Sequence, residues 1–322
     1  MALKVLILGG SGFVGRHLIE HLQRAGAEVT APTRRLASAR EIWPLPCVTV
    51  LEADVTQPET LARLLPGHDA VVNLVATLHG SAARFEHLHV ELPRRLAQAC
   101  AATGVRRLVH VSALGAAADG PSRYQRSKAA GEAVLQEAAV AGRIDLTVLR
   151  PSVIFGADDH FMTLFARLQR WFPLIPLAGA DARFQPVWVR DVADALVRCL
   201  QRATTIGQTY EACGPEVYTL RELVRLAGQW AGVREGRGRP ILGLPGPLAW
   251  LQALAMECLP GQPLLSRDNL DSMKVDNVAS GQSPGLDALG ITPASLLAVG
   301  PWMLGTAGNA ARLEVLRSYA GR

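Results

Sequence analysis

The sequence predicts an α/β protein in which a doubly wound parallel sheet is joined to a smaller, irregular C-terminal region. In the first half of the chain, short apolar segments alternate with segments of helical periodicity, which is the rhythm of βαβ units. The apolar segments carry few polar residues, and such strands are typical of a parallel sheet that helices cover on both faces. In the second half, prolines and glycines interrupt the chain repeatedly and the expected helices are shorter.

The expected elements follow in chain order. Strands are predicted at 5–8, 28–31, 48–51, 70–75, 107–111 and 146–149, and helices at 13–25, 59–65, 85–102, 122–141, 189–201 and 220–231. We expect residues 1–155 to form the sheet domain, with segments near 184–213 and 264–278 returning to it. Residues 156–183 and 214–322 are expected to form the smaller region, which closes over the carboxyl ends of the strands, where ligands bind in open α/β sheets.

Composition narrows the class of protein. Of the 322 residues, 49% are hydrophobic and 19% are charged, as in a well-packed globular protein. The net charge is +5 and the arginines are scattered, so the sequence does not indicate a nucleic-acid-binding protein, although a weak attraction to anionic membranes is compatible with it. The five cysteines form no CxxC pair, and the N-terminal apolar run is too short for a signal peptide. We therefore expect unpaired thiols and a cytoplasmic protein.

A glycine-rich turn joins the first strand to the first helix. Gly9 permits a tight turn, Gly12 lets the backbone approach a pyrophosphate, and Gly15 lets the helix pack closely on the strand. The first helical amides, at Phe13 and Val14, and the helix dipole then hold the phosphates. Strand, turn and helix in this order are the context that a dinucleotide-binding, Rossmann-type fingerprint requires. The alternative is a glycine-rich turn without a ligand.

The end of the second strand selects between the two nicotinamide dinucleotides. An NAD site usually has an acidic residue here, which bonds the ribose 2′-hydroxyl, and this chain has none. Arg34 and Arg35 instead suit bidentate contacts with a 2′-phosphate, so we predict NADP, with NADPH preferred over NADH. The alternative is a pair of solvated loop arginines. After the third strand, Asp54 and Val55 are placed to meet the adenine, or they belong to an ordinary helix N-cap region.

Tyr124 and Lys128 form the candidate catalytic pair. They lie four residues apart in an expected helix, so they share one face of it. A phenol has a pKa near ~10 in water, and a nearby ammonium group lowers that value. The pair is therefore expected to exchange a proton near neutrality. Ser112 ends the fifth strand and is placed to hydrogen-bond a substrate carbonyl or hydroxyl group.

Several motifs together resemble the short-chain dehydrogenase/reductase superfamily, in its extended or atypical branch of NAD-dependent epimerase/dehydratase-like proteins. They are the glycine turn at 9–15, the strand end NLVA at 73–76, Ser112, the pair Tyr124 and Lys128, RPSVIFG at 150–156 and FQPVWVRDVA at 184–193. The resemblance covers nearly the whole chain. Segments 89–95, 150–156, 264–268 and 276–278 are similar to the nucleotide-binding accessory subunit of respiratory complex I and its free-standing bacterial relatives.

This resemblance implies roles for individual residues. It implies that Tyr124 is the general acid/base, that Lys128 also binds the nicotinamide ribose and that Ser112 orients the substrate. The further cofactor-binding residues expected on this basis are Ala76, Pro151 and Val153. Hydride transfer itself belongs to the cofactor. Members of the superfamily often dimerise through helices that here correspond to 85–102 and 122–141, so a homodimer is one candidate assembly.

Departures from the family pattern bear on the activity. Sugar-nucleotide dehydratases carry an acidic pair after the hydroxyl residue of the fifth strand, whereas Ala113 and Leu114 follow Ser112 here, which argues against a dehydratase. The loop from Ser112 to Tyr124 offers few polar groups to hold a sugar. In the complex I subunit the bound nucleotide is thought to be structural, so the resemblance also leaves a chain without turnover as an alternative.

Two apolar segments, 161–177 and 241–256, lie in the second half. The second has no charge, but it is shorter than the ~20 residues of a spanning helix and contains prolines. We expect core helices here, or an apolar lid that accepts a lipid-like substrate or rests on a membrane surface. No cluster of cysteine and histidine supplies a metal site: His87 and His89 face different directions on a helix, and His110 is expected in the core.

The sequence thus predicts an NADP(H)-dependent oxidoreductase that transfers hydride to or from a carbonyl or hydroxyl group of an apolar small molecule. One alternative is a non-catalytic NADPH-binding accessory or assembly subunit of a respiratory membrane complex, peripheral at the inner membrane. Another is a nucleotide-sugar epimerase that uses the same transient oxidation. The intact pair of Tyr124 and Lys128 favours the oxidoreductase, and the resemblance to the complex I subunit favours the accessory role.

Overall fold

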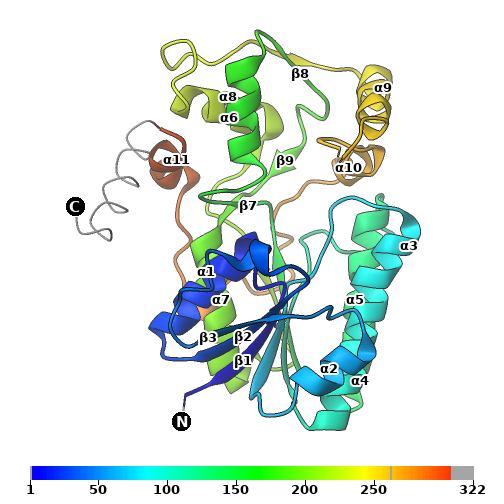
Figure 1. Cartoon of the computed structure of the whole chain (residues 1–322). Coiled ribbons are helices and arrows are strands. Elements are labelled where there is room, and N and C mark those ends of the chain that lie inside the picture. Colours follow the sequence, from blue (N-terminus) through cyan, green and yellow to red (C-terminus); the bar gives the residue numbers. More distant parts are fainter. Residues whose placement is uncertain (1, 262, 306–322) are drawn as a thin grey trace, which may run out of the picture. The chain divides into compact units, whose positions relative to one another are not determined.

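The computed structural model describes residues 2–261 and 263–305, which form two compact units built from interleaved segments (Figure 1). The first unit takes Met1–Pro151, Val189–Ala212 and Ala279–Thr292, and the second takes Ser152–Trp188, Cys213–Val278 and the described part of Pro293–Arg322. The segments that return to the first unit are therefore 189–212 and 279–292. The segment 264–278, which the sequence analysis assigned to the sheet domain, lies in the second unit.

A seven-stranded parallel sheet forms the centre of the first unit, which confirms the predicted α/β, Rossmann-like class. Its strand order is β11-β6-β5-β4-β1-β2-β3. The strands are β1 (Lys4–Leu8), β2 (Glu28–Thr33), β3 (Val48–Glu52), β4 (Ala70–Asn73), β5 (Arg107–Val111), β6 (Asp145–Pro151) and β11 (Thr209–Ala212). In the register, Leu6 of β1 lies between Thr30 of β2 and Val71 of β4. The strand order reverses between β1 and β4, so the topological switch point lies beside the glycine turn.

Helices cover both faces of this sheet (Figure 1). On one face, α1 (Phe13–Arg24) contacts α7 (Val189–Gln201), and on the other, α4 (Leu92–Thr103) contacts both α2 (Pro58–Leu64) and α5 (Arg123–Val140). Helix α7 buries Val192, Leu196 and Cys199, which recur at the three- to four-residue spacing of one helical face. Short helical turns η1 (Leu36–Ala39), η3 (Ala203–Thr205) and η4 (Leu286–Leu289) complete the unit.

The helix expected at 85–102 is confirmed, but it begins at Ala82 and contains a π-helical segment, so that three pieces follow one another without a gap. They are α3 (Ala82–Phe85), the π-helix η2 (Glu86–Glu91) and α4. Pro93 has no N–H, so it cannot donate to the carbonyl oxygen of His89 four residues earlier. That oxygen faces Gly131 of α5, where an added Cβ would lie only 1.9 Å from it. Pro93 of α4 and Gly131 of the neighbouring helix α5 thus accompany the wider π-helical turn.

The second unit is built on two helices, α6 (Met162–Trp171) and α8 (Leu220–Trp230), which pack together over a core that includes Phe155, Leu223 and Leu296. Three small strand pairs join its segments: β7 (Ile154–Phe155) with β10 (Val187–Trp188), β8 (Ile175–Leu177) with β13 (Ile241–Gly243), and β9 (Arg183–Phe184) with β12 (Tyr218–Thr219). Its remaining helices are α9 (Gly246–Glu257), α10 (Arg267–Ser272) and α11 (Leu296–Leu304). None of the helices in the described ranges combines the length and the hydropathy that crossing a bilayer requires.

Candidate functional site

The glycine turn between β1 and α1 is packed tightly against backbone atoms. Gly9 has a φ angle of +86°, and a Cβ there would lie 3.2 Å from the carbonyl carbon of Leu74, which follows β4. A Cβ on Gly15 would lie 2.5 Å from the carbonyl oxygens of both Gly9 and Gly10. These two positions therefore require glycine, Gly9 for its backbone conformation and Gly15 for its close packing.

Helix α1 begins directly after this turn, and no side chain caps its N-terminus. The N-cap residue, Gly12, donates its own N–H to the carbonyl oxygen of Gly9 at 3.0 Å. The first helical amides, at Phe13, Val14 and Gly15, have no intrahelical acceptor, as in any helix. Uncapped amides beside a turn that excludes side chains fit the pyrophosphate of a dinucleotide.

Arg34 and Arg35 follow β2 directly and are exposed. Neither forms an ion pair with another residue that the structure describes. The hydroxyl of Thr33 donates to the carbonyl oxygen of Arg35 at 3.2 Å and lies 3.3 Å from the hydroxyl of Ser11 in the glycine turn. The end of β2 is thereby attached to the turn, with two arginine side chains available beside it.

Asp54 organises the turn that leads from β3 to α2. Its Oδ1 atom accepts hydrogen bonds from the N–H of Thr56 at 3.0 Å and from the Thr56 hydroxyl at 2.8 Å. Burial would raise the pKa of Asp54, but the bonds from Thr56 and the charge of Arg34 outweigh it, so the pKa is lowered. The next residue, Val55, is buried in the core of the first unit.

Lys128 and Ser112 are brought together where α5 packs on the end of β5. The ammonium group of Lys128 donates to the carbonyl oxygen of Val111 at 2.9 Å, one residue before Ser112. Lys128 is 1% exposed, and burial lowers its pKa to about 8 against the opposing charge of Glu132. The Ser112 hydroxyl is buried and has no hydrogen-bond partner among the described residues. An unpartnered hydroxyl beside an ammonium group is suited to a polar ligand.

Tyr124 lies one helical turn before Lys128, and its phenol is not activated as expected. Burial raises the pKa of Tyr124 to about 12, so the prediction of a lowered value is wrong for the structure. The ring packs against Phe85 and His89, with centroid separations of 6.3 and 5.7 Å. Apolar and aromatic surroundings disfavour the phenolate, and the Lys128 ammonium is bonded to a backbone carbonyl instead.

His89 has a structural role that the sequence analysis missed. Its Nε2 atom accepts the N–H of Thr77 at 3.1 Å, and its Nδ1 atom lies 2.8 Å from the hydroxyl of Ser127. That hydroxyl in turn donates to the carbonyl oxygen of Tyr124 at 2.8 Å. Burial and the charge of Lys128 lower the pKa of His89 to about 3, so the ring is neutral. The nearest sequence signal is Pro93, because its missing amide accompanies the π-helical turn that contains His89.

Two polar side chains organise the end of β4. Asn73 donates from Nδ2 to Nδ1 of His110 at 3.2 Å and accepts the N–H of Val75 at 3.2 Å. His110 is 2% exposed, which confirms the prediction of a core histidine, and burial lowers its pKa well below the usual value. Ala76, the residue counted among the cofactor contacts, is exposed in the loop that follows β4.

A buried ion pair lies one helical turn beyond Lys128. Arg150 of β6 donates through Nε and Nη2 to both carboxylate oxygens of Glu132, at 2.5 to 3.1 Å. Pro151, the last residue of the first unit's strand β6, accepts the N–H of Leu114 at 2.9 Å. Val153 belongs to the second unit, where its N–H donates to Oδ1 of Asn277 at 3.2 Å.

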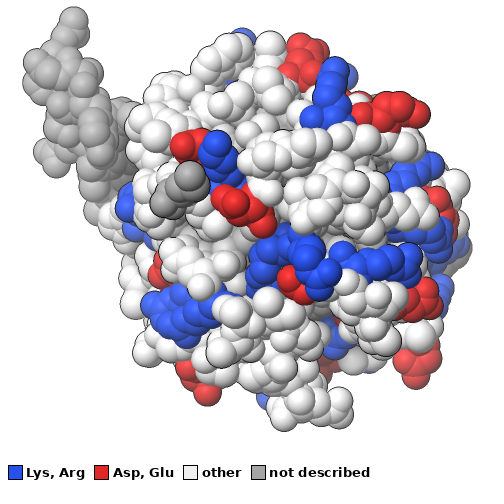
Figure 2. All heavy atoms as spheres, turned by 90° about the horizontal axis from the view of Figure 1, so that it is seen from below, with Lys and Arg blue, Asp and Glu red and all other residues white. Residues whose placement is uncertain are grey.

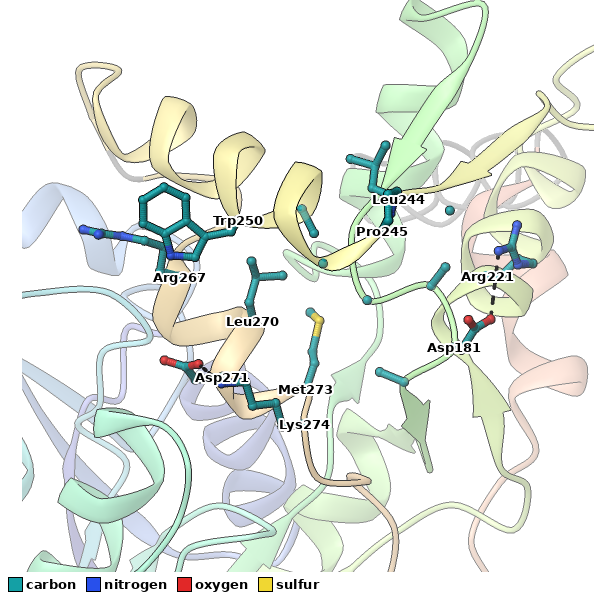
Figure 3. Close-up of a pocket in the computed structure, with 16 residues that line it drawn as sticks. Asp181, Arg221, Leu244, Pro245, Trp250, Arg267, Leu270, Asp271, Met273 and Lys274 are labelled. Carbon is teal, nitrogen blue, oxygen red and sulfur yellow. Dashed lines mark ion pairs between the residues drawn. The ribbon is translucent and has the colours of Figure 1, made fainter.

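A pocket of about 680 Å³ lies within the second unit (Figure 3). Leu270 of α10 and Met273, which directly follows α10, point toward α9, and Trp250 of α9 stacks against the guanidinium of Arg267 at 5.5 Å. The other charged side chains that line it are paired, Arg221 with Asp181 at 3.9 Å and Lys274 with Asp271 at 2.7 Å. Small residues such as Gly179, Ala180, Gly243 and Ala249 leave the space open. The pocket thus has an apolar interior and an ionic rim.

The surface charges and the potential metal ligands of the described residues are two further features that bear on ligand binding. On the face that Figure 2 shows, basic and acidic side chains lie next to one another among uncharged residues. Within the described parts of the chain, no three histidine, cysteine, aspartate or glutamate side chains gather as metal ligands would.

Comparison with known proteins identifies the family. The model of the NAD dependent epimerase/dehydratase family matches residues 5–213. The mitochondrial NADH dehydrogenase (ubiquinone) 1 alpha subcomplex subunit 9 of Mus musculus is 31% identical over 300 residues, which is 90% of this chain and 76% of the relative. A ceramide reductase of Caulobacter vibrioides is 27% identical over 245 residues, covering 76% of this chain and 74% of the reductase.

The solved structures agree on the fold. A dTDP-glucose 4,6-dehydratase from Streptomyces venezuelae, solved with NAD, is 22% identical with a TM-score of 0.66 over 84% of this chain and 94% of the dehydratase. At that identity the likeness concerns the fold alone. With the family match over more than half of its length, the strand order and the glycine turn, the chain belongs to the NAD dependent epimerase/dehydratase family.

Proposed function

We propose that this protein binds NADP(H) as an accessory or assembly component of a respiratory membrane complex, and that the nucleotide is held rather than turned over. The observation that carries the proposal is the similarity to the mitochondrial subunit over 90% of the chain. The burial of Tyr124, which raises the pKa of its phenol to about 12, agrees with a side chain that keeps its proton near neutrality.

The residues of the first unit fit the nucleotide. The glycine turn and the uncapped start of α1 would hold the pyrophosphate, and Arg34 and Arg35 would pair with the 2′-phosphate. Lys128 and Ser112 would contact the nicotinamide ribose and its surroundings. When bound, the dinucleotide supplies a hydride for redox chemistry.

Nucleotide content and selectivity test this proposal. The purified full chain is denatured, any released nucleotide is identified, and the emptied protein is titrated with NADPH and NADH. We expect retained NADPH, and a loss of NADPH affinity of about 10- to 100-fold in the variant Arg34→Ala with Arg35→Ala, since charge-assisted bonds contribute about 1.5–3 kcal/mol. Arg40→Ala, an exposed arginine six residues downstream of Arg34, is the matched control and should bind as the parent does. A preference for NADH would contradict the assignment of NADP.

A second candidate function is the reduction of an apolar carbonyl compound, and the unpartnered hydroxyl of Ser112 favours it. Ser112 would donate a hydrogen bond to the carbonyl oxygen, and Tyr124 would deliver the proton that this oxygen takes up, while Lys128 holds a positive charge nearby. The similarity to a ceramide reductase supports an apolar substrate class.

Tyr124→Phe distinguishes the two candidates. For a reductase, the variant loses NADPH oxidation with long-chain ketones while its NADPH affinity is retained. For an accessory protein, the parent chain shows no oxidation with these ketones, and the variant restores membrane-complex assembly in a deletion strain as well as the parent does. Ketone-dependent oxidation by the parent that Tyr124→Phe abolishes would overturn the accessory role.

A further inference from the structure

Helix α9 is apolar around most of its circumference, yet six of its twelve residues are exposed. Only Ala249 and Ala253 of its twelve residues are buried, and Glu257 at its last position is the only charge. Leu248, Trp250 and Leu251 are 52%, 49% and 56% exposed. A helix that is apolar on all sides is normally enclosed by protein or by lipid, so the exposed side of α9 is expected to have a partner.

The exposed apolar surface continues beyond α9. The side-chain amide of Gln252 donates to the carbonyl oxygen of Pro176 at 3.0 Å, which attaches α9 to β8. Opposite Pro176 in the β8–β13 pair is Leu242, which is 54% exposed. Just before β8, the end of α6 exposes three further large side chains. We call the following residues the apolar face: Trp171, Phe172, Leu174, Leu242, Leu248 and Leu251. Helix α6, β8 and α9 lie along the upper part of the second unit in Figure 1, and β13 is paired with β8.

Arginines flank this face. Arg167 and Arg170 are exposed on α6, and the loop that holds Arg234 and Arg237 is attached to the same helix, because Arg239 donates its N–H to Oε1 of Gln169 at 2.7 Å. None of the four exposed arginines has an ion-pair partner within the described ranges; they are Arg167, Arg170, Arg234 and Arg237. Residues 160–174 contain no acidic residue and residues 223–256 contain only Glu235, while Glu257 at the end of α9 is paired with Arg267.

We propose that the apolar face docks on the surface of a bilayer that contains anionic lipid. Tryptophan, phenylalanine and leucine side chains would enter the boundary between headgroups and acyl chains, and the flanking arginines would bind lipid phosphates. Unpaired arginines around an apolar surface match a negatively charged membrane in charge and in polarity. The inference deepens the proposed association with a membrane complex, but it does not depend on the nucleotide, so the two proposals fail separately.

Vesicle flotation tests the docking directly. The full chain is mixed with vesicles of phosphatidylcholine, or of phosphatidylcholine with phosphatidylglycerol, and the bound fraction is measured. We expect binding to the anionic vesicles, and a partition coefficient about fivefold lower for each arginine removed in Arg170→Gln and Arg237→Gln, which corresponds to about 1 kcal/mol each. Trp171→Ser with Leu251→Ser should weaken binding at least tenfold. Because both side chains are exposed, these variants should fold and bind NADPH like the parent.

Matched changes in the first unit provide the controls. Trp43, which is 54% exposed, is replaced by serine, and Arg40 by glutamine, and both variants should float like the parent. In vesicles with brominated acyl chains, tryptophan fluorescence should be quenched, and Trp171→Phe should reduce that quenching whereas Trp43→Phe should not. A parent chain that stays unbound, or binding that the Trp171 and arginine variants leave unchanged, would overturn the proposal and leave the face to a protein partner.

Discussion

Nδ1 of His89 and the hydroxyl of Ser127 are joined at 2.8 Å, which links the π-helix η2 to helix α5. Because Nε2 of the same ring accepts the N–H of Thr77, the proton must lie on Nδ1 and the imidazole donates to Ser127. Ser127 then donates to the carbonyl oxygen of Tyr124. A neutral histidine thus positions the helical turn that carries Tyr124, and it does so without contacting a ligand.

This relationship predicts a pH dependence of stability. The folded pKa of His89 is about 3, and the ordinary value is 6.5, so between these values the unfolded chain binds more protons than the folded chain. The free energy of unfolding should therefore fall as the pH is lowered from about 6.5, with His89 contributing at most about 1.4 kcal/mol per pH unit. Urea unfolding at several pH values should show a shallower slope in His89→Asn. The exposed His87→Asn should keep the parent's slope, and an unchanged slope in His89→Asn would contradict the neutral ring.

Lys128 predicts a second dependence of the free energy of unfolding on pH, in the alkaline range. Its folded pKa is about 8, and the ordinary value is 10.5, so the folded chain loses this proton first. Stability from this group should increase as the pH rises from about 8 toward 10, by at most about 1.4 kcal/mol per unit. The same unfolding measurements on Lys128→Met should lack this rise. The comparison is restricted to pH values below about 9, because above that value the buried thiols of Cys100 and Cys199, with pKa values raised to about 12, begin to act in the opposite direction.

Gly131 should not tolerate a methyl group. Alanine normally stabilises a helix interior by up to about 1 kcal/mol relative to glycine. At Gly131, however, the added Cβ would lie 1.9 Å from the backbone oxygen of His89, so Gly131→Ala should destabilise the fold by about 1–3 kcal/mol or more. Gly246→Ala, which has no atom within 4 Å of its added Cβ, is the control and should leave the melting temperature unchanged or slightly raised. Equal stability of both variants would refute the close approach of η2 and α5.

The ion pair of Glu132 and Arg150 should be costly to break. Glu132 is 2% exposed, and its replacement by glutamine leaves a partly buried guanidinium without its counter-ion. We expect Glu132→Gln to lower the free energy of unfolding by about 3–5 kcal/mol. Glu20→Gln is the control: it removes a carboxylate from the exposed ion pair with Arg24, and it should change the free energy of unfolding by no more than about 0.5 kcal/mol. Because the charge of Glu132 also raises the pKa of Lys128, the alkaline rise should begin at a lower pH in Glu132→Gln.

The predictions about the fold that the structure confirms are those that depend on short-range sequence patterns. The six strands of the first half are apolar runs between turn residues, and each prediction lies within a few residues of an observed strand. Glycine spacing likewise predicted the turn at Gly9 and Gly15. The π-helical turn at His89 lies against Gly131, forty-two positions away in the chain, and no local pattern contains that contact.

In the candidate site, too, local spacing predicted some features, whereas contacts between residues distant in the sequence determine others. Helical spacing correctly placed Tyr124 and Lys128 on α5, but the direction of the Tyr124 pKa depends on which groups surround the phenol. Phe85 and His89 supply an aromatic enclosure, and the Val111 carbonyl holds the lysine, so proximity in sequence did not predict the electrostatics. The apolar segments were recognised in the sequence, whereas the exposure of Trp171 and Leu251 required the packing of the second unit.

The interleaving of the two units has a consequence for synthesis on the ribosome. Strand β6 borders β11, which is made more than fifty residues later, and the last piece of the first unit ends at Thr292. A nascent chain that has reached only Pro151 therefore carries a sheet whose edge strand is apolar and unpaired, without the cover of α7. An unpaired edge strand can pair with strands of other chains. Chains that end within residues 152–208 are therefore expected to aggregate or to bind chaperones, rather than to form an independent nucleotide-binding domain.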